Sequence, residues 1–226
     1  MTHQRYAYRK PDMESCTINI SEIFHTLQGE GPWIGMPSVF IRLGGCIAPY
    51  CPWCDTSFAW EDYTERTIIE ILDEVKRYPC RRIVITGGEP FLQWESGLRT
   101  LHDELFSRGY VIGYETSGKT GIPKIETAMI VCSPKYIDGS WRIDPGCLGN
   151  ADFFKFLFVD AGMSEDILDF ISRNSIPGEK VFIMPEGPVG AVQLERMKSC
   201  FEFCRHNQFR MTPRLHTLIF DDTRGV

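Results

Sequence analysis

The feature that most limits the fold of this chain is a regular alternation of short apolar runs with longer amphipathic segments. The apolar runs are rich in β-branched and aromatic residues, as in "RRIVITGG" (81–88), which is typical of buried strands. The segments between them carry apolar residues at helical spacing, such as Ile68, Leu72 and Val75 in a helix predicted over 64–78. Strands separated by helices of about 10 to 15 residues predict βα units and a parallel sheet.

Local signals refine the predicted helices. Thr67 followed by Glu70 indicates a capping box at the start of the first helix. Gly109 is the predicted stop of the second helix, and Ser164 is the predicted cap of the third. A fourth helix is predicted over 189–207. The other apolar runs predict strands at "TINISEIF" (17–24), "PSVFIRL" (37–43), "YVIGYETSG" (110–118), "AMIVCSPK" (128–135), "FFKFLFVD" (153–160), "KVFIMPEG" (180–187) and "RLHTLIF" (214–220).

Polar clusters follow several of these strands directly. In parallel α/β folds, ligands bind at the carboxyl ends of the strands, so we expect the clusters to converge on one site. With about six core parallel strands after the first, the sequence favours a partial parallel β/α barrel over a closed eight-stranded one. The clusters are "TGGEP" (86–90), "ETSG" (115–118), "SPK" (133–135) and "MPEG" (184–187), and a cysteine-rich loop follows the strand at 37–43.

Length and composition fit one ordinary domain. We expect residues 17–226 to form a single domain and residues 1–16 to form an N-terminal tail. The net charge of −6 argues against a nucleic-acid-binding surface, which would need a basic stripe. The polar N-terminus has no apolar signal segment, and no run approaches the roughly 18 apolar residues of a membrane span. A cytoplasmic protein is therefore expected.

Three of the nine cysteines stand together in "RLGGCIAPYCPWCDTSF" (42–58), with no fourth cysteine nearby. A CxxC pair alone is a weak signal, since it occurs in redox pairs and in halves of zinc sites. A closed structural zinc site has four ligands, so here it would need completion by Cys80 or His102. A cubane 4Fe–4S cluster has four irons, and three thiolates would leave one iron open for another ligand. The scattered cysteines are expected to pack as small buried hydrophobes.

The cysteine loop, with Trp53 just before its last cysteine and "GGEP" at 87–90, resembles the radical S-adenosylmethionine (SAM) enzymes. Within that superfamily the chain resembles the 7-carboxy-7-deazaguanine synthases of queuosine and 7-deazapurine biosynthesis. The combination of "QGEG", "CDT" and "TGGEP" is more specific than "GGEP" alone. The similar blocks are "FHTLQGEGPWIGMPSVFIRLGGC" (24–46), "CPWCDT" (51–56), "ITGGEP" (85–90), "YETSG" (114–118), "SPK" (133–135) and "RLH" (214–216), so the resemblance covers nearly the whole chain.

Two features depart from the family pattern. The usual spacing of radical SAM loops is C-x3-C-x2-C, but Cys46 and Cys51 enclose four residues, Ile47 to Tyr50. We expect the additional residue to bulge outward from the loop. At the other end, "TLIFDDTRGV" continues past His216, and the family motifs do not place this tail in the site.

The resemblance implies a lyase with a 4Fe–4S cluster bound by Cys46, Cys51 and Cys54. SAM would chelate the open iron, which explains why the loop lacks a fourth thiolate. Reduction would cleave SAM to methionine and a 5′-deoxyadenosyl radical that abstracts a substrate hydrogen. The implied reaction converts 6-carboxy-5,6,7,8-tetrahydropterin to 7-carboxy-7-deazaguanine with loss of ammonia.

The resemblance also assigns residues to SAM. Gly87 and Gly88 are expected to let the backbone approach the methionine part of SAM, where a side chain would collide. Glu89 is expected to contact its ammonium group. The other residues at SAM-binding positions are Trp53, Cys54, Asp55, Ser133, Pro134, Lys135, Met184, Pro185, Glu186 and Gly187.

A second set of residues matches the substrate and metal positions of the family. Arg42 suits the pterin carboxylate, because a guanidinium can bind a carboxylate through two hydrogen bonds. Glu30 is expected to accept hydrogen bonds from the aminopyrimidine edge, and Thr56 matches a Mg²⁺ ligand. Taken singly, each has a plain structural alternative, such as a surface charge or a turn residue. The other substrate positions are Leu27, Gln28, Gly29, Thr86 and His216.

Two other functional classes remain open at this stage. One is a radical SAM activase that takes a hydrogen atom from a partner enzyme and so needs an open protein-docking groove. The other is a non-enzymatic metal-binding interaction module, which would leave the "TGGEP" and "SPK" clusters without a role. The synthase hypothesis implies a flavodoxin- or ferredoxin-like electron donor and a homodimer.

Overall fold

The computed structural model describes residues 13–226 and shows a mixed α/β architecture. Eleven strands and five α-helices, with short 3-10 and π turns between them, make up the described chain. The strands are β1 (Thr17–Leu27), β2 (Pro37–Leu43), β3 (Thr64–Thr67), β4 (Arg82–Gly87), β5 (Val111–Thr116), β6 (Ala128–Cys132), β7 (Lys135–Ile137), β8 (Ser140–Arg142), β9 (Phe153–Phe158), β10 (Val181–Pro185) and β11 (Arg210–Met211). The helices are α1 (Ile68–Val75), α2 (Arg99–Ser107), α3 (Met163–Arg173), α4 (Gly190–Asn207) and α5 (Leu215–Phe220).

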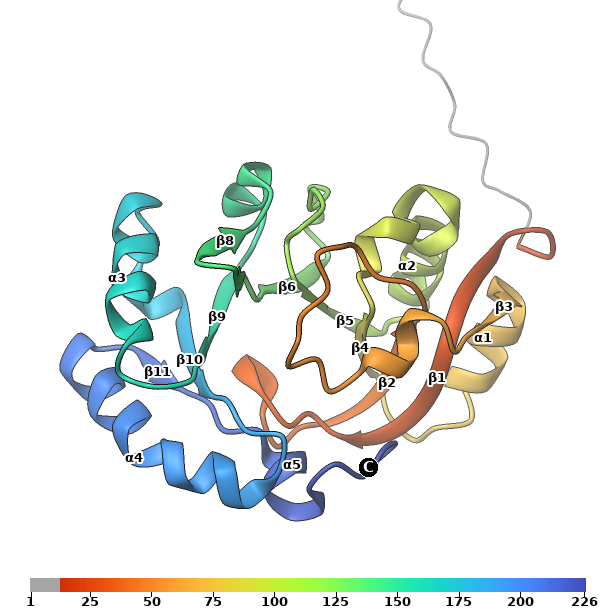
Figure 1. The fold of residues 1–226 in the computed structure, drawn as a ribbon. Helices are drawn as coiled ribbons and strands as arrows, with labels where there is room; N and C mark the ends of the chain where they lie inside the picture. Colours follow the sequence, from red (N-terminus) through yellow and green to blue (C-terminus); the bar gives the residue numbers. More distant parts are fainter. Residues whose placement is uncertain (1–12) are drawn as a thin grey trace, which may run out of the picture.

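Nine strands form one curved sheet in the order β11-β10-β9-β6-β5-β4-β2-β1-β3. All neighbours from β2 to β11 pair in parallel, whereas β1 is antiparallel to both β2 and β3. Figure 1 shows the sheet as an open curve, with α3 and α4 near one end and α1 near the other. The predicted partial β/α barrel, with six core parallel strands and a short seventh, is confirmed.

The core lies between the sheet and its helices. Every residue of β10 is buried, as expected for a parallel strand covered on both faces. Ile68, Leu72 and Val75, the predicted apolar face of α1, are buried, and Ile71 is buried beside them. None of the described helices is long and apolar enough to cross a membrane.

Some helix boundaries differ from those predicted. The capping box of Thr67 and Glu70 is present, but 64–67 form the strand β3, so the helix begins at Ile68 and not at residue 64. Gly109 follows α2 with a φ of +79°, as its predicted role as a stop requires. The prediction that Ser164 caps the third helix is wrong, because Gly162 occupies that position.

The prediction of a last strand at 214–220 is also wrong, because Leu215–Phe220 form the helix α5. Its apolar run suits a strand, but among the described strands none pairs with it, and the segment packs as a helix against α4. The backbone is satisfied locally, with Leu218 N donating to Arg214 O at 3.0 Å. The expected tail lies largely outside the described residues, whereas 13–16 form a turn that leads directly into β1.

Candidate cluster, SAM and substrate site

The three loop cysteines follow the carboxyl end of β2, and each is partly exposed. The last two are joined by a turn in which Cys54 N donates to Cys51 O at 3.1 Å. The base of the loop is held where Gly45 N donates to Ala59 O at 2.9 Å. The loop is therefore anchored at the edge of the sheet where parallel α/β proteins bind ligands.

The "GGEP" turn at the end of β4 is bound to the base of the cysteine loop through the backbone. Gly88 N donates to Leu43 O at 3.0 Å, and Glu89 N donates to Gly45 O at 2.9 Å. A Cβ at Gly88 would overlap the carbonyl oxygen of Gly45, and Gly87 has a φ of +116°. A side chain at Gly88 would therefore collide with the loop itself, and the expected close approach of this backbone to SAM stays a prediction.

Glu89 connects this turn to the end of the next strand. Its side chain is fully buried and accepts hydrogen bonds from Thr116 Oγ1 at 2.6 Å and Ser117 N at 3.0 Å. Ser117 Oγ donates to the same carboxylate at 2.5 Å. Glu89 therefore fixes the "GGEP" turn against the "ETSG" turn, and its expected contact with the SAM ammonium group stays a prediction.

The donor set of the loop fits an iron–sulfur cluster. Burial raises the pKa of both the Cys46 and Cys54 thiols, so bound metal is needed to hold them as thiolates at neutral pH. Within residues 13–226, no three His, Cys, Asp or Glu side chains converge closely enough to hold a single metal ion. A cubane cluster does not need such convergence, because each cysteine binds a different iron.

The two candidates for a fourth zinc ligand are placed elsewhere. Cys80 precedes β4 and lies 3.1 Å from Pro37 O, at the amino end of the sheet, opposite the cysteine loop. His102 is buried in α2, where its ring nitrogens lie 3.0 Å from Tyr114 Oη and 2.8 Å from Thr127 Oγ1. A zinc site completed by either residue is therefore wrong for this fold.

A buried cation connects two carboxylates inside the barrel. Lys155, in the middle of β9, places its ammonium 2.5 Å from Glu30 Oε2 and 2.8 Å from Glu115 Oε2. Gln28 Nε2 donates to Glu115 Oε1 at 3.3 Å, and Gln28 Oε1 accepts from Glu30 N at 3.3 Å. Together Gln28, Glu30 and Glu115 line a small internal space.

The two carboxylates titrate differently. Burial by itself raises the pKa of Glu30, but Lys155, Arg214 and His216 outweigh burial and hold that pKa well below its usual range. Burial raises the pKa of Glu115, which Lys155 offsets only in part. Burial also disfavours the charged form of Lys155, but Glu115 and Glu30 together hold its pKa above the usual value. The charged state of Glu30 is thus the more strongly stabilised.

Arg214 joins three motifs that are far apart in the sequence. Its guanidinium forms an ion pair with Asp55, donates to Gly187 O at 3.0 Å and lies 3.4 Å from Glu30 Oε1. Its own backbone N donates to Gln193 Oε1 at 2.7 Å. One buried side chain therefore holds the "QGEG", "CDT" and "MPEG" segments together.

The residues expected to bind the substrate carboxylate and Mg²⁺ are neighbours in the structure. Arg42 Nε donates to Glu22 Oε1 at 2.6 Å, and a second guanidinium nitrogen donates to Thr56 Oγ1 at 3.2 Å. Thr56 Oγ1 in turn donates to Asp55 Oδ1 at 2.6 Å, which places a carboxylate beside the expected Mg²⁺ ligand. Thr86 is paired with Arg42 across β4 and β2.

The other substrate positions lie around the "QGEG" segment. His216 of α5 lies against Gly29, where a Cβ would overlap the imidazole ring. Leu215 N donates to Gly29 O at 2.9 Å, and His216 Nε2 lies 4.0 Å from Glu30 Oε1. The side chain of Leu27, at the end of β1, is 47% exposed, unlike the buried residues of the network.

The "SPK" cluster follows β6, and "MPEG" spans the end of β10 and the two residues after it, at the edge that the sequence predicted. Ser133 N donates to Thr116 O at 2.8 Å, and Lys135 Nζ donates to Ser133 Oγ at 2.9 Å. Glu186 is held in an ion pair with Arg196 of α4. The remaining expected SAM positions are Pro134 before β7, Met184 and Pro185 at the end of β10, and the partly exposed Trp53.

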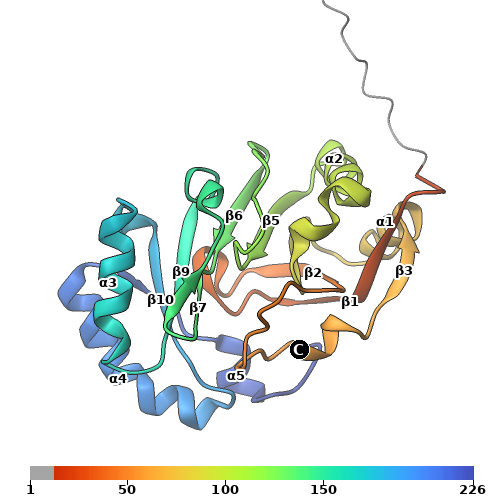
Figure 2. The ribbon, with the colours of Figure 1, turned by 45° about the horizontal axis from the view of Figure 1, so that its top comes forward.

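The tail after His216 packs beside the loop between β2 and β3, as Figure 2 shows. Arg224 donates to Glu22 Oε2 at 2.9 Å and to Asp62 Oδ2 at 3.2 Å. Its guanidinium also lies 3.6 Å from the centroid of the Phe58 ring. The tail thus supports the segment that follows the cysteine loop.

Three residues in this region were missed by the sequence analysis. Lys155 could have been found as the one charged residue within the apolar run "FFKFLF" (153–158), since a buried charge needs a partner. Arg214 lies in the motif that supplied His216, but only the fold shows its contacts. Lys119 follows "ETSG" and reaches the cysteine loop, and no local pattern indicates this.

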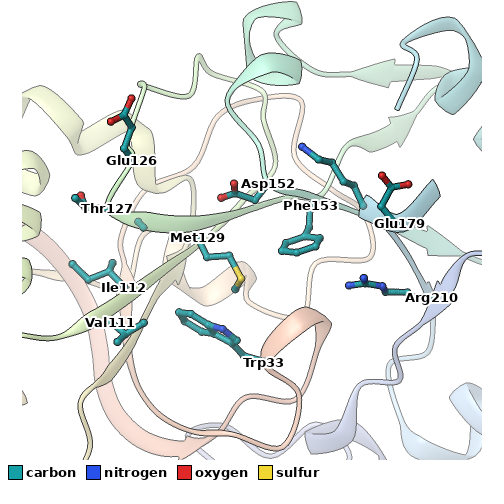
Figure 3. Close-up of a pocket in the computed structure, with 12 residues that line it drawn as sticks. Trp33, Val111, Ile112, Glu126, Thr127, Met129, Asp152, Phe153, Glu179 and Arg210 are labelled. Carbon is teal, nitrogen blue, oxygen red and sulfur yellow. The ribbon is translucent and has the colours of Figure 1, made fainter. Parts of the chain in front are cut away.

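A hollow of about 690 Å³ lies on the opposite edge of the sheet. Figure 3 shows Trp33, Met129 and Phe153 pointing into it, with Asp152 and Arg210 at its sides. Its walls include the amino ends of β5, β6 and β9. Because these strands are parallel to β2, the hollow and the cysteine loop lie at opposite ends of the strands.

Comparison with known proteins gives consistent results. No protein-family model matches the sequence. The 7-carboxy-7-deazaguanine synthase of Hyperthermus butylicus is 32% identical over 233 residues, which cover 95% of this chain and 98% of that protein. The synthase of Aquifex aeolicus is 32% identical over 88% of this chain and 92% of its own. The crystal structure of QueE from Escherichia coli matches with a TM-score of 0.77 at 26% identity, covering 90% of this chain and 96% of that chain.

The partial barrel and its three-cysteine loop define a radical SAM enzyme, which uses a 4Fe–4S cluster and SAM. The identity and coverage of the relatives narrow the assignment further. The chain belongs to the 7-carboxy-7-deazaguanine synthase family.

Proposed function

We propose that this chain converts 6-carboxy-5,6,7,8-tetrahydropterin to 7-carboxy-7-deazaguanine with loss of ammonia, in queuosine and 7-deazapurine biosynthesis. Family membership supports this activity. The observation that carries it is the set of contacts made by Arg214 with Glu30, Asp55 and Gly187. These contacts bring the segments that match substrate-binding positions and those that match SAM-binding positions into one site.

In this proposal Cys46, Cys51 and Cys54 hold the 4Fe–4S cluster. When bound, the reduced cluster and SAM supply the 5′-deoxyadenosyl radical that takes a hydrogen atom from the substrate. The backbone junction between "GGEP" and the cysteine loop holds the SAM-binding edge in a fixed position relative to the cluster ligands. The SAM-binding role extends to the positions in "SPK" and "MPEG" that match the family.

Substrate recognition is assigned to the polar groups inside the barrel. Glu30, kept ionised by its cationic neighbours, accepts hydrogen bonds from the aminopyrimidine edge. Arg42 binds the pterin carboxylate, with part of its guanidinium already occupied by Glu22. Thr56 supplies an oxygen to Mg²⁺, and Asp55 beside it adds negative charge to that position.

A flavodoxin- or ferredoxin-like protein is proposed as the electron donor, because the cluster must receive single electrons. A homodimer is proposed as the working assembly. Sedimentation at several protein concentrations tests the dimer, and reduction of the reconstituted cluster by candidate donors tests the electron source.

The function is tested anaerobically with protein reconstituted with iron and sulfide. SAM and a chemical reductant are added, and 5′-deoxyadenosine is quantified with and without 6-carboxytetrahydropterin. The expected result is strong stimulation by the pterin together with a new deazaguanine absorbance. Slow SAM cleavage that the pterin does not change would leave the radical SAM chemistry but remove this substrate, and a partner-protein activase would then be the better hypothesis.

A further inference from the structure

Lys119 contacts the cysteine loop at the segment that departs from the usual spacing. Its ammonium donates to Pro49 O at 2.6 Å and to Ile47 O at 3.3 Å, and it lies 3.7 Å from Cys51 Sγ. All three partners lie between Cys46 and Cys51 or at Cys51 itself, which is where the additional residue is accommodated. One side chain from outside the loop therefore organises its longest turn.

The turn that carries Lys119 is held in place by hydrogen bonds. Lys119 follows Gly118, whose φ of +69° is in the left-handed region and whose N donates to Thr116 Oγ1 at 3.0 Å. Lys119 N lies 3.3 Å from Ser117 Oγ, which it uses as an acceptor. Both hydroxyls donate to the buried carboxylate of Glu89. The ammonium is thus held by a turn fixed to the protein core, and it is not carried on a free loop.

The position of this charge matters for a cluster bound at Cys51. Adding an electron to an iron–sulfur cluster makes the cluster and its thiolates more negative, so a nearby cation stabilises the reduced form more than the oxidised form. Hydrogen bonds to the sulfurs and local charge are established determinants of cluster potential. A cation beside one ligand sulfur therefore shifts the potential upward.

We propose that Lys119 is a positioning residue of the cluster site, holding the extended turn between Cys46 and Cys51 and raising the reduction potential of the cluster through its charge beside Cys51. This inference rests on the cluster in the proposed function but not on its substrate. It gives the four-residue segment between Cys46 and Cys51 a binding partner, Lys119, within the same chain.

The first experiment uses the protein without its cluster and measures hydrogen–deuterium exchange across 46–54. Lys119→Met is expected to increase exchange in this segment about tenfold, because it removes the donor that two loop carbonyls share. Lys119→Arg, which keeps charge and donors, is expected to restore much of the protection. Lys124→Met is the matched control, since that lysine forms a surface ion pair with Glu126 and its side chain is 78% exposed.

The second experiment measures the midpoint potential of the reconstituted cluster by redox titration monitored by electron paramagnetic resonance. Lys119→Met and Lys119→Gln are both expected to shift the potential downward, whereas Lys119→Arg and Lys124→Met leave it near the wild-type value. The glutamine side chain still offers a hydrogen-bond donor to the loop. The midpoint potential can therefore be measured on this variant if the methionine variant does not retain iron.

Increased exchange together with a lowered potential supports the proposal. Unchanged exchange in Lys119→Met overturns the structural part, and an unchanged potential in Lys119→Gln overturns the electrostatic part. Neither measurement uses the pterin, so a wrong substrate assignment in the preceding section would leave both outcomes interpretable.

Discussion

Replacing Lys155 by Met tests the buried charge network most directly. The lysine side chain is 6% exposed and holds Glu30 and Glu115 at 2.5 and 2.8 Å. Methionine keeps the apolar stem but removes the charge. Breaking a buried pair by removing one partner costs about 3–5 kcal/mol, because the remaining charge is uncompensated. Arg214 still lies 3.4 Å from Glu30, so we expect a loss near the lower limit, about 3 kcal/mol of unfolding free energy at pH 7.

The loss should depend on pH in a characteristic direction. Burial already raises the pKa of Glu115 above its unfolded value of 4.5, and removing Lys155 removes the main opposing influence. Between pH 4.5 and the raised folded pKa, the native state binds the extra proton more tightly than the unfolded state. The stability of the variant relative to wild type should therefore improve as the pH falls from 7 toward 5.

Urea unfolding of both proteins at pH 7 and pH 5 measures these differences. The matched control is the double variant Lys155→Met with Glu115→Gln, which removes one negative charge along with the positive one. We expect it to recover more than half of the lost stability at pH 7. A single-variant loss below about 1 kcal/mol, or a double variant no more stable than the single one, would refute the reasoning.

Four further predictions concern the site and its support. Cys51→Ala should abolish SAM cleavage with an unchanged thermal midpoint, because this cysteine lies on a partly exposed loop; loss of folding would favour a structural metal. Arg42→Ala should weaken pterin binding at least about tenfold more than SAM binding in parallel titrations, and equal losses would contradict its role. Gly88→Ala should reduce stability by at least about 2 kcal/mol and lower iron incorporation, because its Cβ would displace the Gly45 carbonyl; normal iron content would count against the junction. Burial lowers the pKa of His102 below its unfolded value of 6.5, so below pH 6.5 the unfolded state binds more protons and stability falls as the pH falls. His102→Gln should remove up to about 1.4 kcal/mol per pH unit of this slope in denaturant titrations, and an unchanged slope would disprove it.

Much of the fold could be predicted from local patterns. The parallel strands from β2 to β10 follow apolar runs whose residues are buried on both faces, and their order of appearance predicted βα units. The strand predicted at 214–220 is wrong because its apolar pattern is equally compatible with a helix, and the segment packs as the helix α5 against α4. Whether a short apolar run forms a strand or a helix depends on the strands and helices that it can pair with or pack against. A local sequence pattern does not contain this information.

The candidate site divides in a similar way. Motif spacing identified the cysteine loop, the glycine pair and the polar clusters, because backbone geometry and metal ligation require particular residue types at fixed separations. The requirement for glycine at position 88 is visible only in the fold, because the carbonyl group of Gly45 occupies the space that a side chain would need. The roles of Lys119 and Arg214 likewise depend on contacts between segments far apart in the chain.

The sequence by itself determined the class of fold, the three-cysteine loop and the edge of the sheet where the motifs gather. These follow from periodicity, residue chemistry and the rule that parallel strands end at one edge. Only the tertiary structure decided which charges meet: Lys155 between Glu30 and Glu115, and Arg214 against Asp55. A buried charge is tolerated only beside its partner, and in this chain the partners are separated by 40 to 159 positions. Folding is what brings them within hydrogen-bonding distance.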